Sequence, residues 1–154
     1  MPFRRMQYTM ERRMPFDITG TWKLLAWKRF EGDTTHYPLG EQVTGILIYA
    51  ADGSMAVQMT ALDRPHIPTS DPQGGTAEER AAAYSTCLAY FGRWSQAPDD
   101  EIVTHYVDAS LFPNWSETVQ ERPFTCDGRY LALRTPPAEG PNGTVVNEMS
   151  WERA

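Results

Sequence analysis

The sequence has few of the features that would assign it to a familiar functional class. It contains 2 cysteines in 154 residues and no uninterrupted run of about eighteen apolar residues. It therefore predicts neither a disulfide-rich scaffold nor a membrane-spanning helix. Acidic residues outnumber basic ones by 20 to 14, which gives a net charge of −6. This charge argues against nucleic acid or an anionic membrane as the main partner.

Motifs for metal and cofactor chemistry are missing as well. The 3 histidines, His36, His66 and His105, are far apart in the sequence, and neither His-x-x-x-His nor Cys-x-x-Cys occurs. There is no glycine-rich phosphate loop, no dinucleotide fingerprint and no nucleophile motif. We therefore expect no metal and no cofactor, so any chemistry would depend on ordinary side chains.

The first residues of the chain differ in composition from the rest. Four arginines there are opposed only by Glu11, and no apolar segment typical of a secretory signal follows them. We interpret residues 1–15 as a flexible basic extension and residues 16–154 as one barrel domain. An organelle transit peptide, or a tail that docks on the second subunit of a homodimer, is the alternative. We expect a cytoplasmic protein in which Cys87 and Cys126 are reduced thiols.

The remainder of the chain is punctuated by turn residues between short alternating segments. In the first segment Trp22, Leu24 and Ala26 share one face, whereas Lys23 and Arg29 lie on the other. The dipeptides Asp52-Gly53 and Asp127-Gly128 predict tight turns between neighbouring strands. On this basis we predict strands at 20–30, 44–50, 54–62, 90–96, 101–110, 116–125, 129–135 and 144–152.

A single helix is expected between these strands. Thr76 and Glu79 have the spacing of a capping box, and an alanine-rich run follows, so we predict a helix over 77–89. Tyr84, Cys87 and Leu88 would then plug one end of the fold. About eight strands in hairpin succession predict an all-β, antiparallel up-and-down barrel with one helix closing or flanking it, and a sandwich is the alternative. Such a barrel is either packed solid or holds one small molecule.

Several segments resemble the bacterial and fungal lipocalin-like domain proteins. The resemblance covers nearly all of 18–153, and its most specific part is the run from Ser110 to Trp115. It is carried by Gly20-Thr21-Trp22-Lys23-Leu24, Pro38-Leu39-Gly40, Gly45-Ile46-Leu47-Ile48-Tyr49, Asp52-Gly53-Ser54-Met55, Ala89-Tyr90-Phe91-Gly92, Thr104-His105-Tyr106, Ser110-Leu111-Phe112-Pro113-Asn114-Trp115 and Trp151-Glu152-Arg153.

The resemblance implies a lipocalin-type barrel with an apolar cup. It also implies that Trp22 of the first strand packs on Arg153 of the last strand as a structural closure. Some lipocalin-fold relatives carry lipids or aromatic compounds, and others act as decarboxylases, cyclases or isomerases without a cofactor. The chain differs from secreted lipocalins because it has neither a signal nor an obvious disulfide.

The alternation along each strand predicts which side chains face the barrel lumen. In 101–110 the odd positions face inward, and in 116–125 the even positions do, because Glu117 and Glu121 are best placed in water. Inward polar groups are costly without partners, which favours a wet pocket or ligand site over a satisfied polar network. The predicted ligand-binding residues are Met55, Val57, Met59, Tyr90, Trp94, Gln120, Asn147 and Trp151.

Two inward residues are candidates for catalysis. His105 would act as an acid or base, and Arg122 would stabilise developing negative charge, with Asn147 or Gln120 as a further donor. The alternatives are a hydrogen-bonded core histidine, and an arginine that pairs with Glu121 or Glu148 on the outside. Phe112 and Trp115 are interpreted as packing residues rather than as a ligand rim.

Three functions follow from these assignments. The protein binds a small apolar or aromatic molecule in the lumen, or it acts on such a molecule as a cofactor-free isomerase, cyclase or dehydratase of secondary metabolism. In the third alternative the barrel is packed and serves as an interaction module. A lumen without a few hundred Å³ of space would exclude the first two.

Overall fold

The computed structural model of the protein describes residues 16–98 and 100–154, so the predicted basic extension lies outside the described residues. The described chain is built mainly from strands, and the α-helix lies between the strands in sequence. The elements are β1 (Gly20–Glu31), β2 (Thr34–His36), β3 (Val43–Tyr49), β4 (Ser54–Ala61), α1 (Ala77–Ser85), β5 (Cys87–Gln96), β6 (Ile102–Ser110), the 3-10 helix η1 (Pro113–Trp115), β7 (Thr118–Cys126), β8 (Tyr130–Arg134), β9 (Ala138–Gly140) and β10 (Gly143–Arg153).

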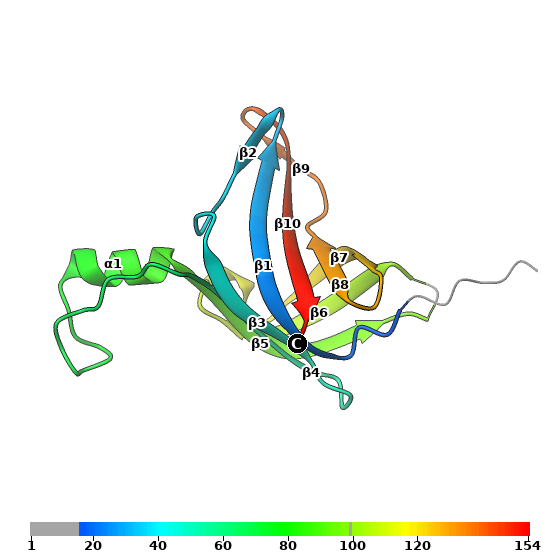
Figure 1. Ribbon diagram of the computed structural model, residues 1–154, viewed down its shortest axis with the longest axis horizontal. Coiled ribbons are helices and arrows are strands. Elements are labelled where there is room, and N and C mark those ends of the chain that lie inside the picture. The colour runs from blue at the N-terminus through cyan, green and yellow to red at the C-terminus, as the bar shows by residue number, and fades with distance from the viewer. Residues whose placement is uncertain (1–15, 99) are drawn as a thin grey trace, which may run out of the picture.

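Eight of the described strands form a closed antiparallel barrel. Neighbours pair in the order β1-β3-β4-β5-β6-β7-β8-β10, and β10 pairs back with β1, so no edge is left in this ring. The short strands β2 and β9 extend the tall β1–β10 pair at its upper end in Figure 1. The predicted all-β barrel of roughly eight antiparallel strands with one α-helix is confirmed.

Most inner faces follow the period-two alternation of the sequence. In β6 the buried residues are Val103, His105 and Val107, as predicted from the odd positions of that strand. In β7 Arg122 and Phe124 are buried, and Glu121, which lies between the inward positions 120 and 122, is exposed. Alternation therefore identifies the lumen wall wherever a strand is regular.

The first strand departs from this alternation because it contains a bulge. Its pairing with β10 slips between Leu24 and Ala26, so Leu25 is an extra residue on that strand. Before the bulge Trp22 and Leu24 are buried, whereas after it the inward positions are odd-numbered, and Glu31 is buried. The predictions that Ala26 shares the inner face and that Arg29 lies on the outer one are therefore wrong.

The helix α1 forms where the capping box predicts it but ends earlier and lies elsewhere. Thr76 accepts a hydrogen bond from the Glu79 backbone N–H, and the Glu79 carboxylate accepts one from the Thr76 N–H. The helix ends at Ser85 because Cys87 already pairs with β4 as the first residue of β5. None of its residues is buried, and Figure 1 shows it projecting to one side of the barrel. The predicted helical plug at the barrel end is thus wrong, and Leu88 lies on β5.

One end of the barrel is closed by a tryptophan and an arginine. The guanidinium carbon of Arg153 lies 4.2 Å from the centre of the Trp22 ring, and the Trp22 indole donates to the Ile18 carbonyl at 2.9 Å. Arg153 also donates to the carbonyls of Asp17 at 2.7 Å, Thr19 at 2.8 Å and Gly128 at 2.8 Å. Each of its three guanidinium nitrogens therefore has an acceptor. This is the closure that the family resemblance implies.

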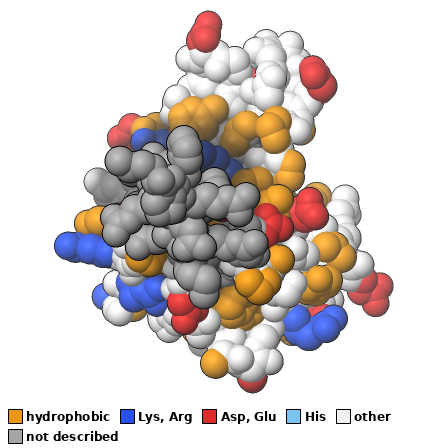
Figure 2. All heavy atoms as spheres, turned by 90° about the vertical axis from the view of Figure 1, so that its right-hand side faces the viewer, with side chains coloured by type: hydrophobic (Ala, Val, Ile, Leu, Met, Phe, Trp, Pro, Cys, Tyr) orange, Lys and Arg blue, Asp and Glu red, His pale blue; other side chains and the backbone are white. Residues whose placement is uncertain are grey.

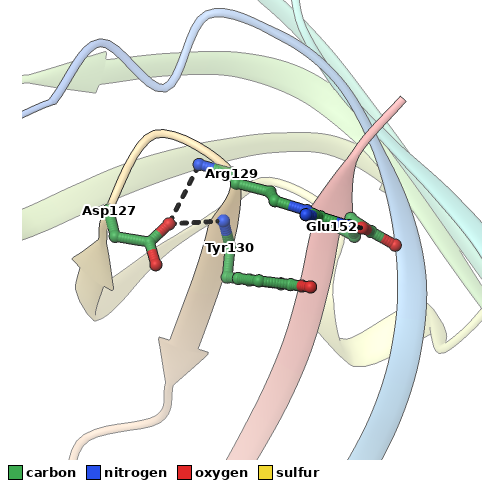
Figure 3. Close-up of polar contacts among 4 residues, drawn as sticks. All are labelled: Asp127, Arg129, Tyr130 and Glu152. Carbon is green, nitrogen blue, oxygen red and sulfur yellow. Dashed lines mark hydrogen bonds and ion pairs between the residues drawn. The ribbon is translucent and has the colours of Figure 1, made fainter.

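The turn between β7 and β8 lies beside this closure. The Asp127 carboxylate accepts hydrogen bonds from the backbone N–H groups of Arg129 at 2.9 Å and Tyr130 at 2.7 Å, as Figure 3 shows. Gly128 adopts a positive φ of 96° that favours glycine in this tight turn. The Arg129 side chain reaches across to Glu152 of β10 at 2.8 Å. The predicted Asp-Gly turn therefore also joins β8 to the last strand.

The outer surface is mixed in character. Several large apolar side chains remain exposed on the outer faces of strands, including Phe91 and Val119. On the face shown in Figure 2, hydrophobic side chains lie between separate groups of acidic and basic ones. No described helix is both long enough and apolar enough to cross a membrane. The cysteines Cys87 and Cys126 are both free thiols.

Candidate functional site

A cavity of about 390 Å³ lies in the half of the barrel away from the Trp22–Arg153 closure. Its wall comes from the later part of β1, the ends of β4 and β5 that meet near α1, the η1 corner, β7 and β10. The apolar lining includes Trp27, Pro38, Leu39, Met59, Leu88, Leu111, Phe112, Trp115 and Met149. This wall is aromatic and thioether-rich, as is typical of a site for a small apolar molecule.

The η1 corner and the end of α1 form part of this wall. The rings of Phe112 and Trp115 meet edge to face at 5.8 Å, and Trp115 meets Tyr90 in the same way at 5.8 Å. Leu111, Phe112 and Tyr84 are exposed, so this part of the wall reaches solvent. Phe112 and Trp115, interpreted from the sequence as packing residues, therefore both pack and line the cavity.

Arg122 is a buried charge in the cavity wall. Only 3% of the residue is exposed, and its guanidinium lies 5.8 Å from the centre of the Trp115 ring. One nitrogen, Nη1, donates to the backbone carbonyl of Glu121 at 2.9 Å, whereas Nε has no hydrogen-bond partner among the described residues. The alternative of an outside ion pair is wrong, because Glu148 instead pairs with Arg134 at 2.7 Å.

The lining of the cavity contains two arginines and, among the described residues, no carboxylate. Arg29 is half-exposed and has Glu31 as a neighbour at 3.7 Å. Arg122 has no such counter-charge in the described part of the chain. Burying an unpaired charge is costly, so a protein retains one where something else compensates it.

Asn147 contributes a polar group with a fixed orientation. Its Oδ1 accepts a hydrogen bond from the Trp27 indole at 2.9 Å. Because an indole N–H can only donate, the oxygen of the amide must face Trp27, and the Nδ2 group is left free to donate. Its backbone N–H donates to the Thr135 hydroxyl at 2.9 Å, which holds this part of β10 in place.

Behind the cavity wall, His105 lies between two tyrosines. Its Nε2 is 2.6 Å from the Tyr49 hydroxyl oxygen, and its Nδ1 is 2.9 Å from the Tyr90 hydroxyl oxygen. His105 is 1% exposed and does not line the cavity, whereas Tyr90 does. His105 is therefore hydrogen-bonded in the core through both ring nitrogens, and it reaches the cavity through Tyr90.

Tyr49, His105 and Tyr90, which are joined by these two hydrogen bonds, are all uncharged near neutral pH. Burial lowers the pKa of His105 to about 3, and the positive charge of Arg122 acts in the same direction. Burial also raises the pKa of the Tyr90 hydroxyl, and it raises the pKa of Tyr49 well above its usual range. Because none of them titrates between about pH 5 and 8, the chain is a set of fixed hydrogen bonds rather than a proton reservoir.

The structure brings together part of the predicted site. Arg122, Tyr90, Asn147 and Met59 line the same cavity. The remaining predicted ligand residues do not line it, and their assignment to a ligand site stays a prediction: Met55, Val57 and Trp151 are buried in the core, Trp94 donates to the Ala50 carbonyl at 2.9 Å, and Gln120 donates to the Thr118 hydroxyl at 2.9 Å.

Other lining residues were not anticipated from the sequence. Trp27 and Arg29 face the cavity because of the bulge at Leu25. The signal that could have identified them is the unbroken apolar run from Leu24 to Trp27, which conflicts with regular alternation. The sequence predicts Cys87 and Leu88 to lie in the helix, whereas the structure places them on β5, where they line the cavity. No group of His, Cys, Asp or Glu side chains in the described residues is arranged to hold a metal ion.

A closed barrel with one sealed end and an apolar cavity toward the other end defines a class of small-molecule-binding β-barrels. The model of the lipocalin-like domain family matches residues 19–154. The chain therefore belongs to the lipocalin-like domain family.

A curated relative adds a named ligand to this comparison. The chain is similar to the 4'-hydroxy-3'-methoxypropiophenone carrier protein ppsC of Aspergillus oryzae, with 39% identity over 82 residues, which cover 47% of this chain and 73% of the relative. The fold and the family together suggest that the barrel binds a small hydrophobic ligand.

Proposed function

We propose that the protein is a carrier that binds a small aromatic molecule in the cavity beside Trp115 and Arg122. The observation that supports this most directly is a space of about 390 Å³ with an aromatic wall and one buried arginine that has no carboxylate partner among the described residues. A single aromatic ring with a short substituent would fit a cavity at the small end of the usual range for ligand sites. The name of the relative describes a carrier of an aryl ketone, which is a molecule of this kind.

The catalytic alternative assigns acid–base chemistry to His105 and charge stabilisation to Arg122. An isomerase, cyclase or dehydratase reaction of this type would need a group that exchanges a proton near the working pH. The low pKa of His105, about 3, and the raised pKa values of Tyr49 and Tyr90 favour binding over turnover. In the catalytic alternative, Tyr90 would be the group through which His105 acts.

The third alternative, a packed interaction module, is less favoured. A packed barrel would leave no space for a ligand, whereas this cavity meets the threshold of a few hundred Å³. A molecule that occupied the cavity would also supply hydrogen-bond acceptors to the Arg122 guanidinium. Both features are expected of a binding site and neither is needed for a solid core.

Compartment and assembly complete the proposal. The free thiols Cys87 and Cys126 are consistent with a reducing compartment, which supports the cytoplasmic location expected from the sequence. A homodimer would be recognised by light scattering coupled to size-exclusion chromatography. The carrier proposal holds for a monomer or a dimer, because the cavity is lined by a single chain.

The proposal is tested by titrating the purified protein with propiophenone while the tryptophan fluorescence is recorded. Trp27 and Trp115 line the cavity, so occupancy should change their emission. Mass spectrometry of the denatured protein should also reveal any aromatic molecule that co-purifies. The carrier proposal is wrong if neither propiophenone nor any co-purifying small molecule binds.

Two substitutions separate carrier from enzyme. In a carrier, Arg122→Ala weakens binding, and no conversion of the ligand is detected by liquid chromatography with either the wild type or the variant. Conversion that is seen with the wild type and lost in His105→Ala or Arg122→Ala would instead support the catalytic alternative.

A further inference from the structure

The hydrogen-bonding character of the cavity wall is set by groups that do not touch a ligand. Tyr49 is buried, and its hydroxyl has a single hydrogen-bond partner among the described residues, the Nε2 atom of His105. A neutral imidazole has one N–H donor and one lone-pair acceptor. The two nitrogens of His105 must therefore play opposite roles toward Tyr49 and Tyr90.

The buried position of Tyr49 decides which nitrogen carries the proton. If Nε2 carried it, the Tyr49 oxygen would accept and its own O–H would have no acceptor among the described residues, which costs about 1–3 kcal/mol. If Nε2 has the lone pair, Tyr49 donates to it, and the O–H left without an acceptor is that of Tyr90, which lines the cavity, whereas Tyr49 does not. The proton then lies on Nδ1 and is donated to the oxygen of Tyr90.

This arrangement frees the proton of the Tyr90 hydroxyl. Its oxygen accepts from His105, so its O–H must find an acceptor elsewhere. Burial raises the pKa of Tyr90, and the positive charge of Arg122 opposes this rise, but a guanidinium can only donate a hydrogen bond. Tyr90 lines the cavity, and its O–H is therefore available to an acceptor that enters there.

Two other polar groups of the cavity wall, those of Arg122 and Asn147, also offer hydrogen-bond donors. Arg122 has only donors: Nη1 donates to the Glu121 carbonyl, and Nε has no hydrogen-bond acceptor among the described residues. The Asn147 oxygen accepts from the Trp27 indole, and its Nδ2 group adds two donors. Three groups that line the same cavity thus offer donors, one of them with a full positive charge, and no described lining residue has a carboxylate.

We propose that the ligand is bound as an anion: an aromatic compound whose negatively charged oxygen is held by Arg122, with donors from Asn147 and Tyr90 beside it. This inference rests on the proposed carrier function and names the chemical class of its ligand. A carboxylate, an enolate or a phenolate shares this chemistry, because each presents charged acceptor lone pairs. A protonated amine would bring further hydrogen-bond donors to a wall that already offers donors, and its positive charge would be repelled by that of Arg122.

The experiment compares four aryl probes of similar size: 3-phenylpropanoate, 3-phenylpropanamide, 3-phenylpropylamine and propiophenone. Dissociation constants are measured by isothermal titration calorimetry at pH 7.5 with the full chain. We expect the carboxylate to bind about ten-fold more tightly than the amide, which corresponds to one charge-assisted hydrogen-bond contact. The amine should bind more weakly than the amide.

A matched pair of variants assigns the preference to one side chain. Arg122→Gln should reduce the affinity for the carboxylate to that for the amide, and it should weaken the binding of propiophenone by a smaller factor. Arg129→Gln, which changes an exposed arginine beside the closed end of the barrel, should leave all four constants unchanged. If Arg122→Gln does not fold, the probe series on the wild type decides alone.

The outcomes distinguish this inference from the function on which it rests. If propiophenone or the amide binds as tightly as the carboxylate, or if Arg122→Gln keeps the ten-fold preference, the anion is not the bound class, and the carrier proposal stands. If none of the four probes binds, the carrier proposal loses its support as well. A preference for the carboxylate that is lost only in the Arg122 variant supports both.

Discussion

Both ends of the barrel contain an arginine beside a tryptophan, but the two pairs differ in what surrounds them. At the closed end the Arg153 guanidinium lies 4.2 Å from the Trp22 ring centre and donates to three backbone carbonyls. At the cavity the Arg122 guanidinium lies 5.8 Å from the Trp115 ring centre, and its Nε has no partner among the described residues. All three guanidinium nitrogens of Arg153 donate to backbone carbonyls, whereas Arg122 has at least one nitrogen without an acceptor in the described residues. The same pair of residue types is thus structural at one end and a candidate for binding at the other.

The substitution expected to reduce stability most is that of Trp22 at the closed end of the barrel. Trp22 is completely buried, so Trp22→Ala removes a large apolar side chain and leaves a cavity. We expect the free energy of unfolding to fall by about 3–5 kcal/mol, as measured by urea denaturation. Trp115→Ala, at the partly exposed cavity wall, is the matched control and should cost clearly less. Equal losses would mean that the two ends do not differ in packing.

The arginine of the closed end should have the next largest effect. Arg153→Met keeps part of the packing on Trp22 but leaves the carbonyls of Asp17, Thr19 and Gly128 without their donor. We expect a loss of about 2 kcal/mol in the same denaturation experiment. A loss below about 0.5 kcal/mol would show that these carbonyls find other donors, and that the closure depends on Trp22 alone.

Acid should destabilise the cavity half through His105. Its pKa is about 3 in the folded protein and near 6.5 in the unfolded chain, so the unfolded state binds more protons in this interval. The free energy of unfolding should therefore fall as the pH is lowered from about 6 to 4, by up to about 1.4 kcal/mol per pH unit. His105→Gln should remove most of this slope. A slope that persists in the variant would assign the acid sensitivity to other groups.

The smallest effect on stability is expected at the arginine of the cavity. Arg122→Met removes a buried charge that has no described counter-charge, so stability should stay constant or rise by about 1 kcal/mol. Binding of 3-phenylpropanoate should nevertheless weaken about ten-fold. A loss of stability similar to that of Arg153→Met would show that Arg122 is also structural, and the contrast between the two ends would fail.

The parts of the fold that follow local rules could be predicted from the sequence. The alternation in β6, β7 and β10 placed His105, Arg122 and Asn147 on inner faces, because a regular strand presents alternate residues to each side. The capping box at Thr76 gave the start of the helix in the same way. These signals lie within a few residues of the feature that they predict.

The remaining parts depend on partners that are distant in sequence. The end of α1 is decided by the pairing of Cys87 and Leu88 with β4, which overrides the helical preference of the alanine-rich run. The separation of His105 from the cavity follows from the positions of Tyr49 and Tyr90 on two other strands. Alternation predicts which face of a strand a residue lies on but not how far along the barrel it lies. It therefore could not separate the residues that line the cavity from those that fill the core.

The bulge at Leu25 has a consequence for how such a barrel can change. In a regular strand alternate side chains face inward, and one extra residue exchanges the inward and outward positions that follow it. In β1 the even-numbered Trp22 therefore faces inward at the sealed end, and the odd-numbered Trp27 faces the cavity. A strand that kept Leu25 but lost the bulge would turn Ala26 and Lys28 inward in place of Trp27 and Arg29, whereas deletion of Leu25 would leave Trp27 and Arg29 two and four positions after Leu24 and therefore still inward. The bulge therefore separates the two ends of β1: a change in the strand after Leu25 can alter which side chains line the cavity without altering the Trp22–Arg153 closure.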